Sequence, residues 1–128
     1  MMNDAESSVD RYFRALSDLD RDAYLESFSS DAVVRDPYGG PERRGTPGLN
    51  AFFDGMEKTW ESFEMVPEDA HRSGNRVAVP WTASGTARNG KTADFAGVNV
   101  FSLDDEGRIE RLEGYWDYEE MAAQLKEQ

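Results

Sequence analysis

The sequence predicts a single α+β domain that spans residues 1–128, on three observations. Apolar residues recur at helical spacing in the first half of the chain, they alternate with polar residues in the second half, and turn residues divide that second half into strands. Helices followed by antiparallel hairpins are typical of a fold in which helices cover one face of a sheet. A chain of 128 residues is large enough to bury one core and too small for two domains.

Two helices and a strand are expected first. The first helix is predicted over residues 6–17, where four residues at helical spacing face inward: Val9, Tyr12, Phe13 and Leu16. Asp20 is a typical N-cap and predicts a short second helix through residues 23–28, which ends at the serine pair that follows. A short apolar strand from Ala32 then leads into Asp36 and Pro37.

A third helix is predicted with Thr46 as its N-cap and Pro47 in its first turn. Its apolar stripe consists of Leu49, Phe52, Phe53, Met56 and Trp60. A short helix is also expected at the end of the sequence, because Asp117 and Glu120 have the spacing of a capping box.

Four antiparallel strands are expected from Glu61 onward, separated by turns at residues 73–75, 89–90 and 104–107. Pro80 lacks an N–H donor inside one of these strands, so it should lie at a sheet edge or a bulge. Residues 93–103 are apolar on both alternations, which indicates that both faces of that strand are covered. Too few helices remain for the second face, so we expect a homodimer that packs sheet against sheet.

Charge and composition exclude several kinds of partner and site. Acidic residues outnumber basic ones by 26 to 14, and the net charge of −12 argues against nucleic acid and an anionic membrane surface as partners. With no cysteine and one histidine, the chain is not expected to hold a zinc ribbon or a histidine-rich metal site. No metal and no other cofactor is expected for its function. Without a signal peptide or a membrane-length apolar run, the expected location is the cytoplasm. The acidic surface indicates either solubility through self-repulsion or a high-salt cytoplasm.

Three polar residues stand where burial is expected: Tyr12 on the inward side of the first helix, Asp36 on the same alternation as Val34, and Asn99 on the same face as Phe101. Each has an ordinary structural interpretation. Tyr12 fits a core aromatic residue, Asp36 a turn residue before proline, and Asn99 a partner for backbone at a bulge.

Together the three residues also suit proton transfer next to a carbonyl group. A carboxylate can take a proton from carbon while two neutral donors stabilise the charge that develops on oxygen. Apolar surroundings make the carboxylate more basic. The same set could instead hold a small ligand with a polar end.

The remaining candidates have simpler explanations. His71 precedes a turn and is expected in an exposed loop. The acidic residues 104–106 lack the ligand pattern of a calcium loop and suit a solvated hairpin. Asp117 is expected to cap a helix rather than to act in catalysis.

The stretch from Val9 to Phe53 resembles the opening half of the ketosteroid isomerase and SnoaL-like polyketide cyclase group, within the nuclear transport factor 2-like superfamily. The features that carry the resemblance are V-x-R-Y on the first helix, F-x-x-D-A-V-V-x-D-P-x-G, and the G-x-x-x-L-x-x-F-F helix. Residues 95–117 are similar to the last two strands of this group. The resemblance implies a cone-shaped fold in which three N-terminal helices pack on a curved antiparallel sheet. It does not specify the reaction, since this fold carries several enzymes and binding proteins.

Ketosteroid isomerases use an Asp as general base and form the oxyanion hole from a Tyr and a protonated Asp. The resemblance assigns the base to Asp36 and the oxyanion-hole tyrosine to Tyr12. It assigns the second acid to Asn99, where the sequence departs from the pattern. It also implies a pocket for a small hydrophobic molecule, lined by Phe53, Phe101, Leu112 and Trp116. Two function classes follow: a cofactor-independent isomerase or cyclase, and a non-catalytic module for ligand binding or dimerisation.

Overall fold

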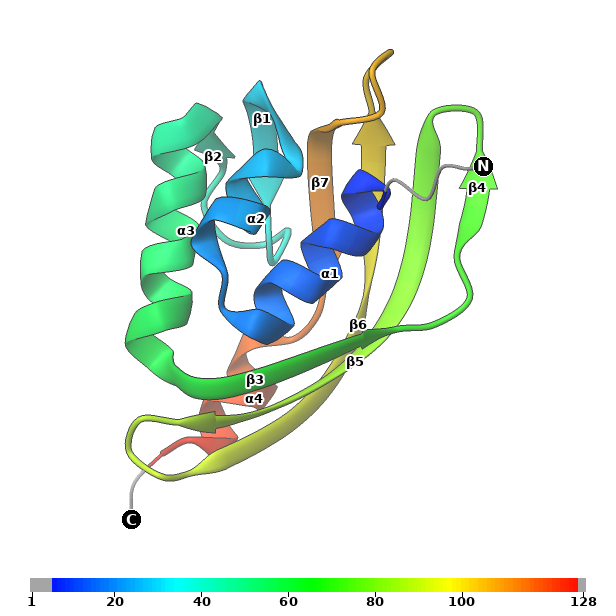
Figure 1. Cartoon of the computed structure of the whole chain (residues 1–128). Coiled ribbons are helices and arrows are strands. Elements are labelled where there is room, and N and C mark those ends of the chain that lie inside the picture. Colours follow the sequence, from blue (N-terminus) through cyan, green and yellow to red (C-terminus); the bar gives the residue numbers. More distant parts are fainter. Residues whose placement is uncertain (1–5, 127–128) are drawn as a thin grey trace.

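The computed structural model describes residues 6–126. Within them, four helices pack on one seven-stranded sheet. In chain order the elements are α1 Ser8–Asp18, α2 Arg21–Glu26, β1 Phe28–Arg35, β2 Arg43–Arg44, α3 Gly45–Thr59, β3 Trp60–Pro67, β4 His71–Ser73, β5 Arg76–Ala87, β6 Thr92–Leu103, β7 Ile109–Tyr115 and α4 Tyr118–Gln124. The predicted α+β class is confirmed, and Figure 1 shows α1, α2 and α3 inside the curve of the sheet.

The strand order in the sheet is β2-β1-β7-β6-β5-β3, with β4 added beside β5. The three expected hairpin turns join β4 to β5, β5 to β6 and β6 to β7. β1 pairs with β7 in parallel, and the other pairs are antiparallel. This parallel pair places the end of β1 beside the end of β7, which matters for the site below.

Several predicted boundaries in the first half of the chain are wrong. α2 ends at Glu26, and β1 begins at Phe28 rather than at Ala32, because Phe28 pairs with Ile109 of β7. Tertiary pairing here overrides the weak strand preference of serine. Arg44, rather than Thr46, occupies the N-cap position of α3 and forms no capping side-chain bond.

Five strands rather than four follow α3, because residues 60–73 form both β3 and the short β4. The two-residue β2, which precedes α3, was also not predicted. Trp60 starts β3 instead of ending the stripe of α3, and His71 lies exposed in β4 rather than in a loop. Pro80 lies inside the sheet where the neighbour of β5 changes from β3 to β4. Its missing N–H therefore falls at an interruption of the pairing, which is consistent with the predicted irregularity.

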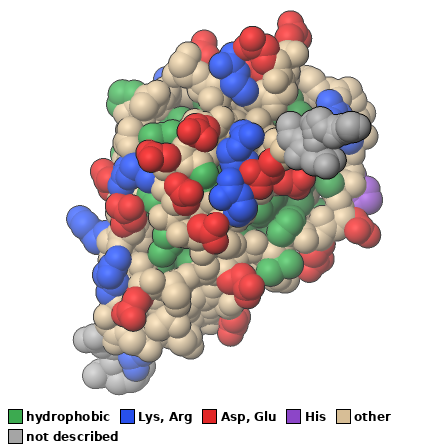
Figure 2. All heavy atoms as spheres, viewed as in Figure 1, with side chains coloured by type: hydrophobic (Ala, Val, Ile, Leu, Met, Phe, Trp, Pro, Cys, Tyr) green, Lys and Arg blue, Asp and Glu red, His purple; other side chains and the backbone are tan. Residues whose placement is uncertain are grey.

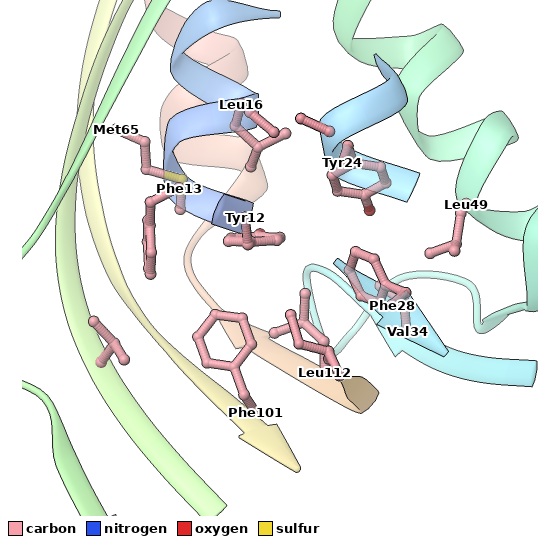
Figure 3. Packing of buried hydrophobic residues seen from close by; sticks show 14 of the residues in the cluster. Tyr12, Phe13, Leu16, Tyr24, Phe28, Val34, Leu49, Met65, Phe101 and Leu112 are labelled. Carbon is pink, nitrogen blue, oxygen red and sulfur yellow. The ribbon is translucent and has the colours of Figure 1, made fainter. Parts of the chain in front are cut away.

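The core lies between the helices and the concave face of the sheet. Tyr12, Phe13 and Leu16 of α1 point toward Phe101 and Leu112 of the sheet (Figure 3). The ring centroids of Tyr12 and Phe101 are 5.1 Å apart in an edge-to-face arrangement, which is a favourable aromatic geometry. Tyr12 is therefore held by packing on its ring, while its hydroxyl group is left for the polar site.

The outer face of β6 is only partly covered in the single chain. Asn99 and Phe101 are buried on the inner alternation, whereas Val98 on the outer alternation is 37% exposed. Coverage of both faces, as the sequence indicates, would require a second molecule, and the homodimer stays a prediction. On the face shown in Figure 2, acidic side chains are dispersed among basic side chains and apolar patches. Within residues 6–126 no helix is long and apolar enough to cross a membrane.

Candidate active site

Asp36 immediately follows β1 and lies at the inner edge of the sheet. Val34, two residues earlier, is fully buried, so the alternation of β1 directs Asp36 toward the interior as predicted. The following loop is attached to β7 by a 2.7 Å hydrogen bond from the Tyr38 N–H to the Gly114 carbonyl. Gly114 leaves space for the Asp36 carboxylate, because a Cβ atom at this position would overlap with Oδ1. Asp36 is thus both a turn residue and an inward-facing acid.

Two donors hold the Asp36 carboxylate. Trp116 Nε1 donates to Oδ1 at 2.6 Å, and the Tyr12 hydroxyl donates to Oδ2 at 3.2 Å. Burial raises the pKa of Asp36 above its ordinary value, while the bonds from Trp116 and Tyr12 and the positive charge of Arg43 act in the opposite direction. The result is a carboxylate of increased basicity whose orientation is fixed on both oxygens.

Asn99 lies behind Tyr12 and away from the cavity. Its Nδ2 donates to the Tyr12 hydroxyl at 3.1 Å, and its Oδ1 accepts from Trp81 Nε1 at 2.9 Å. The residue is fully buried, with both ends of its amide occupied. The structure therefore brings Tyr12, Asp36 and Asn99 into one hydrogen-bonded chain, but Asn99 contacts Tyr12 rather than open space.

A cavity opens beside Tyr12 and Asp36. A small inner space of about 50 Å³ is lined by these two residues and by aromatic and sulfur-containing side chains, including Trp60, Phe95 and Trp116. An open groove of about 1070 Å³ between α3 and α4 lies next to this space, because Asp36, Met56 and Trp116 line both. The predicted base therefore lies where an apolar groove reaches the interior.

The four residues expected to line the pocket divide into two groups. Trp116 lines both the inner space and the groove. Phe53, Phe101 and Leu112 are fully buried in the core and are not part of the cavity wall. Their expected placement was wrong because they pack in the core: Phe101 against Tyr12 of α1, and Phe53 against Tyr24 of α2.

Sequence reasoning missed the two tryptophan donors. Trp116 was expected only as an apolar wall, and Trp81 was not singled out, yet the two indole N–H groups hold the ends of the polar chain. The available signal was that a buried tryptophan N–H almost always requires an acceptor, and the nearby acceptors were Asp36 and Asn99.

The other candidates have structural roles. Asp117 caps α4 by accepting from the Glu120 N–H at 3.1 Å, as predicted. Asp104 accepts from the N–H groups of Glu106 and Arg108 within the β6–β7 hairpin. Among residues 6–126 there is no group of three or more His, Asp or Glu side chains placed to hold a metal ion.

Comparison with known proteins identifies the family. The family model described as the SnoaL-like domain matches residues 9–112, which is most of the chain. The chain belongs to the SnoaL-like family. The resemblance stated from the sequence is thereby confirmed, together with the nuclear transport factor 2-like fold.

Three solved structures show what the chain is similar to. A Δ5-3-ketosteroid isomerase from Mycobacterium sp. has 27% identity and a TM-score of 0.77, with 89% of this chain and 93% of that chain covered. The epoxide hydrolase/cyclase-like enzyme SalBIII, which has a role in pyran ring formation in the polyether salinomycin, has 27% identity and a TM-score of 0.78, with coverage of 88% and 90%. An NTF2-like protein of unknown function from Burkholderia pseudomallei has 25% identity and a TM-score of 0.80, with coverage of 94% and 95%.

Proposed function

We propose that this SnoaL-like protein is a cofactor-independent proton-transfer enzyme, of isomerase or cyclase type, that acts on a small hydrophobic carbonyl compound. The observation that carries the proposal is the Asp36 carboxylate, held by Trp116 and Tyr12 where an apolar groove reaches the interior. A carboxylate with a raised pKa in such surroundings is a suitable general base.

In the proposed reaction Asp36 removes a proton from the carbon next to the carbonyl group. The C–H bond breaks, its electron pair forms a carbon–carbon double bond, and the carbonyl oxygen becomes an enolate. In one outcome the neutral Asp36 returns the proton to another carbon of the same system. In the other, the enolate carbon attacks a second carbonyl carbon and closes a ring, the π bond of that carbonyl breaks, and the neutral Asp36 returns the proton to the alkoxide oxygen that forms. The first outcome is an isomerisation and the second a cyclisation, and neither requires a co-reactant.

Tyr12 supplies the donor for the developing oxyanion. In the free protein its hydroxyl proton is directed at Asp36. When Asp36 takes up a proton it loses its negative charge, and the hydrogen bond that it accepts from the Tyr12 hydroxyl becomes weaker. The hydroxyl can then turn to the enolate oxygen, while Asn99 continues to donate to Tyr12 from behind. Asn99 acts in this scheme as a positioning residue and not as a second oxyanion donor.

The two relatives at 27% identity support proton chemistry on this fold, since one is a ketosteroid isomerase and the other an epoxide hydrolase/cyclase-like enzyme. Turnover of a hydrophobic β,γ-unsaturated ketone to its conjugated isomer, followed by ultraviolet absorbance, tests the proposal. Asp36→Asn should abolish turnover, and Tyr12→Phe should lower the rate by about 100-fold, as expected for loss of an oxyanion donor. Asp105→Asn makes the same chemical change on an exposed hairpin and should behave as wild type.

A non-catalytic ligand-binding module is the second candidate, and one observation favours it. Tyr12 and Trp116 both donate to Asp36, and Asn99 is enclosed, so no donor is already directed at a substrate carbonyl. A binding module would retain phenolic ligands with wild-type affinity in Asp36→Asn and would turn over no ketone in any variant. A ketone turned over by the wild type and not by Asp36→Asn would exclude the binding module.

A further inference from the structure

Arg43 faces into the fold rather than out to solvent. In the pairing of β1 with β2, Arg43 lies opposite Val34, and directly opposed residues of antiparallel strands extend from the same face of the sheet. Val34 is fully buried, and Asp36 continues the same inward alternation. The next residue, Arg44, lies opposite Val33 and points the other way, where it pairs with Glu42 and its side chain is 71% exposed.

The Arg43 side chain forms part of the wall of the groove that leads to Asp36. Its stem packs against the start of α3, where a Cβ atom at Gly48 would come within 3.0 Å of the Arg43 Cβ. Arg43 is partly buried, and within residues 6–126 its side chain forms no ion pair or hydrogen bond. The nearby carboxylate, Asp36, is already held by Trp116 and Tyr12.

In the described part of the chain, the buried side-chain atoms without a partner do not include any nitrogen of Arg43, so its guanidinium group remains open to the groove. Such a group is a good site for a carboxylate, which can accept two parallel hydrogen bonds from it. The protein as a whole repels anions at a net charge of −12, so binding of an anionic ligand requires a local positive charge of this kind. Lys126 adds a second cation at the rim of the same groove.

We propose that Arg43 binds a carboxylate group of the ligand, so that the groove takes up a hydrophobic acid rather than a neutral hydrophobic compound. This inference specifies the substrate class of the proposed function and rests on it for the carbonyl group that meets Asp36. The carboxylate lies at Arg43 in the groove, the apolar body contacts Met56 and Trp60, and the reacting end reaches Tyr12 and Asp36.

The test compares two inert phenolic ligands that differ by one carboxylate, 2-naphthol and 6-hydroxy-2-naphthoate, by fluorescence titration or calorimetry at low salt. Arg43→Met should weaken binding of 6-hydroxy-2-naphthoate by about 10- to 100-fold, which corresponds to the loss of hydrogen bonds between charged groups. Binding of 2-naphthol should change by less than about threefold, since no charged contact is lost. Arg43→Lys keeps the charge but not the paired donors and should lie between the two.

Arg44→Met is the matched control, because it removes a neighbouring arginine that faces away, and it should leave both affinities unchanged. The proposal is overturned if wild type does not bind 6-hydroxy-2-naphthoate, or if Arg43→Met changes both ligands equally or neither. If Arg43→Met changed both affinities equally or neither, the role of Arg43 would be limited to the effect of its positive charge on Asp36. Neither ligand is turned over, so these results are independent of catalysis. A carboxylate preference that depends on Arg43 in a protein without turnover would refute the proposed function alone.

Discussion

Replacement of Trp116 by phenylalanine separates the hydrogen bond of this residue from its packing. The variant keeps an aromatic ring beside Phe95, whose centroid lies 5.3 Å from that of Trp116, and loses the 2.6 Å bond to Asp36. A hydrogen bond to a charged group contributes about 1.5–3 kcal/mol, and one pKa unit corresponds to about 1.4 kcal/mol. Because Trp116 and Asp36 are partly exposed, water replaces some of this loss, so we expect the ionised form to lose an amount near the lower end of this range and the pKa of Asp36 to rise.

The direction of the expected pKa shift depends on which form of Asp36, ionised or protonated, the hydrogen bond from Trp116 stabilises. Trp116 donates to the ionised carboxylate, so its removal favours the protonated form and raises the pKa. Titration of the Asp36 carboxyl carbon by NMR measures this shift without any substrate, and in an active enzyme the acid limb of kcat/KM should move to higher pH by the same amount. Trp81→Phe removes the other indole N–H, which contacts Asn99 and not Asp36, and should shift this titration much less. An unchanged or lowered Asp36 pKa in Trp116→Phe would refute the assigned role of the bond.

Three further predictions concern stability and assembly. Tyr24→Phe should raise the free energy of unfolding by about 1 kcal/mol in chemical denaturation, because the buried Tyr24 hydroxyl has no partner among residues 6–126 and an unsatisfied buried polar group is destabilising. Tyr12→Phe deletes a hydroxyl with two partners and should instead lower it. Sedimentation at micromolar concentration should give a homodimer mass, since the outer face of the sheet exposes Val66 and Val98, and a monomer mass would count against the dimer. Finally, molar potassium chloride should raise the melting temperature by screening the net charge of −12, and a flat or falling value would remove the high-salt interpretation.

Local patterns predicted much of the fold. The hairpin turns at Asn89-Gly90 and at residues 104–107, the Asp117 cap and the inward side of Asp36 all depend on residues close together in the sequence. The parallel pairing of β1 with β7 depends on residues about 80 positions apart, as in Val33 and Arg111, and no local pattern encodes it. That pairing determined where β1 begins, so the boundary at Ala32 was wrong for the same reason.

The site shows a similar limit. The alternation of the strand correctly predicted the face on which Asn99 lies. It could not predict whether Asn99 reaches the cavity, and the residue is in fact enclosed between Tyr12 and Trp81. Arg43 was missed because β2 has only two residues, too few to display any period. Its direction became visible only through its register with Val34.

Solvent deuterium exchange tests the central claim, that Asp36 moves a proton on carbon next to a carbonyl group, without knowledge of the natural substrate. The probe is 2-tetralone, a small hydrophobic ketone with acidic C–H bonds beside the carbonyl, incubated with protein in deuterated buffer and followed by NMR. The account predicts that wild type and Asp105→Asn accelerate exchange at these carbons above the buffer rate, and that Asp36→Asn returns it to the buffer rate. Exchange at the buffer rate in wild type, or equal acceleration by Asp36→Asn, would contradict the claim.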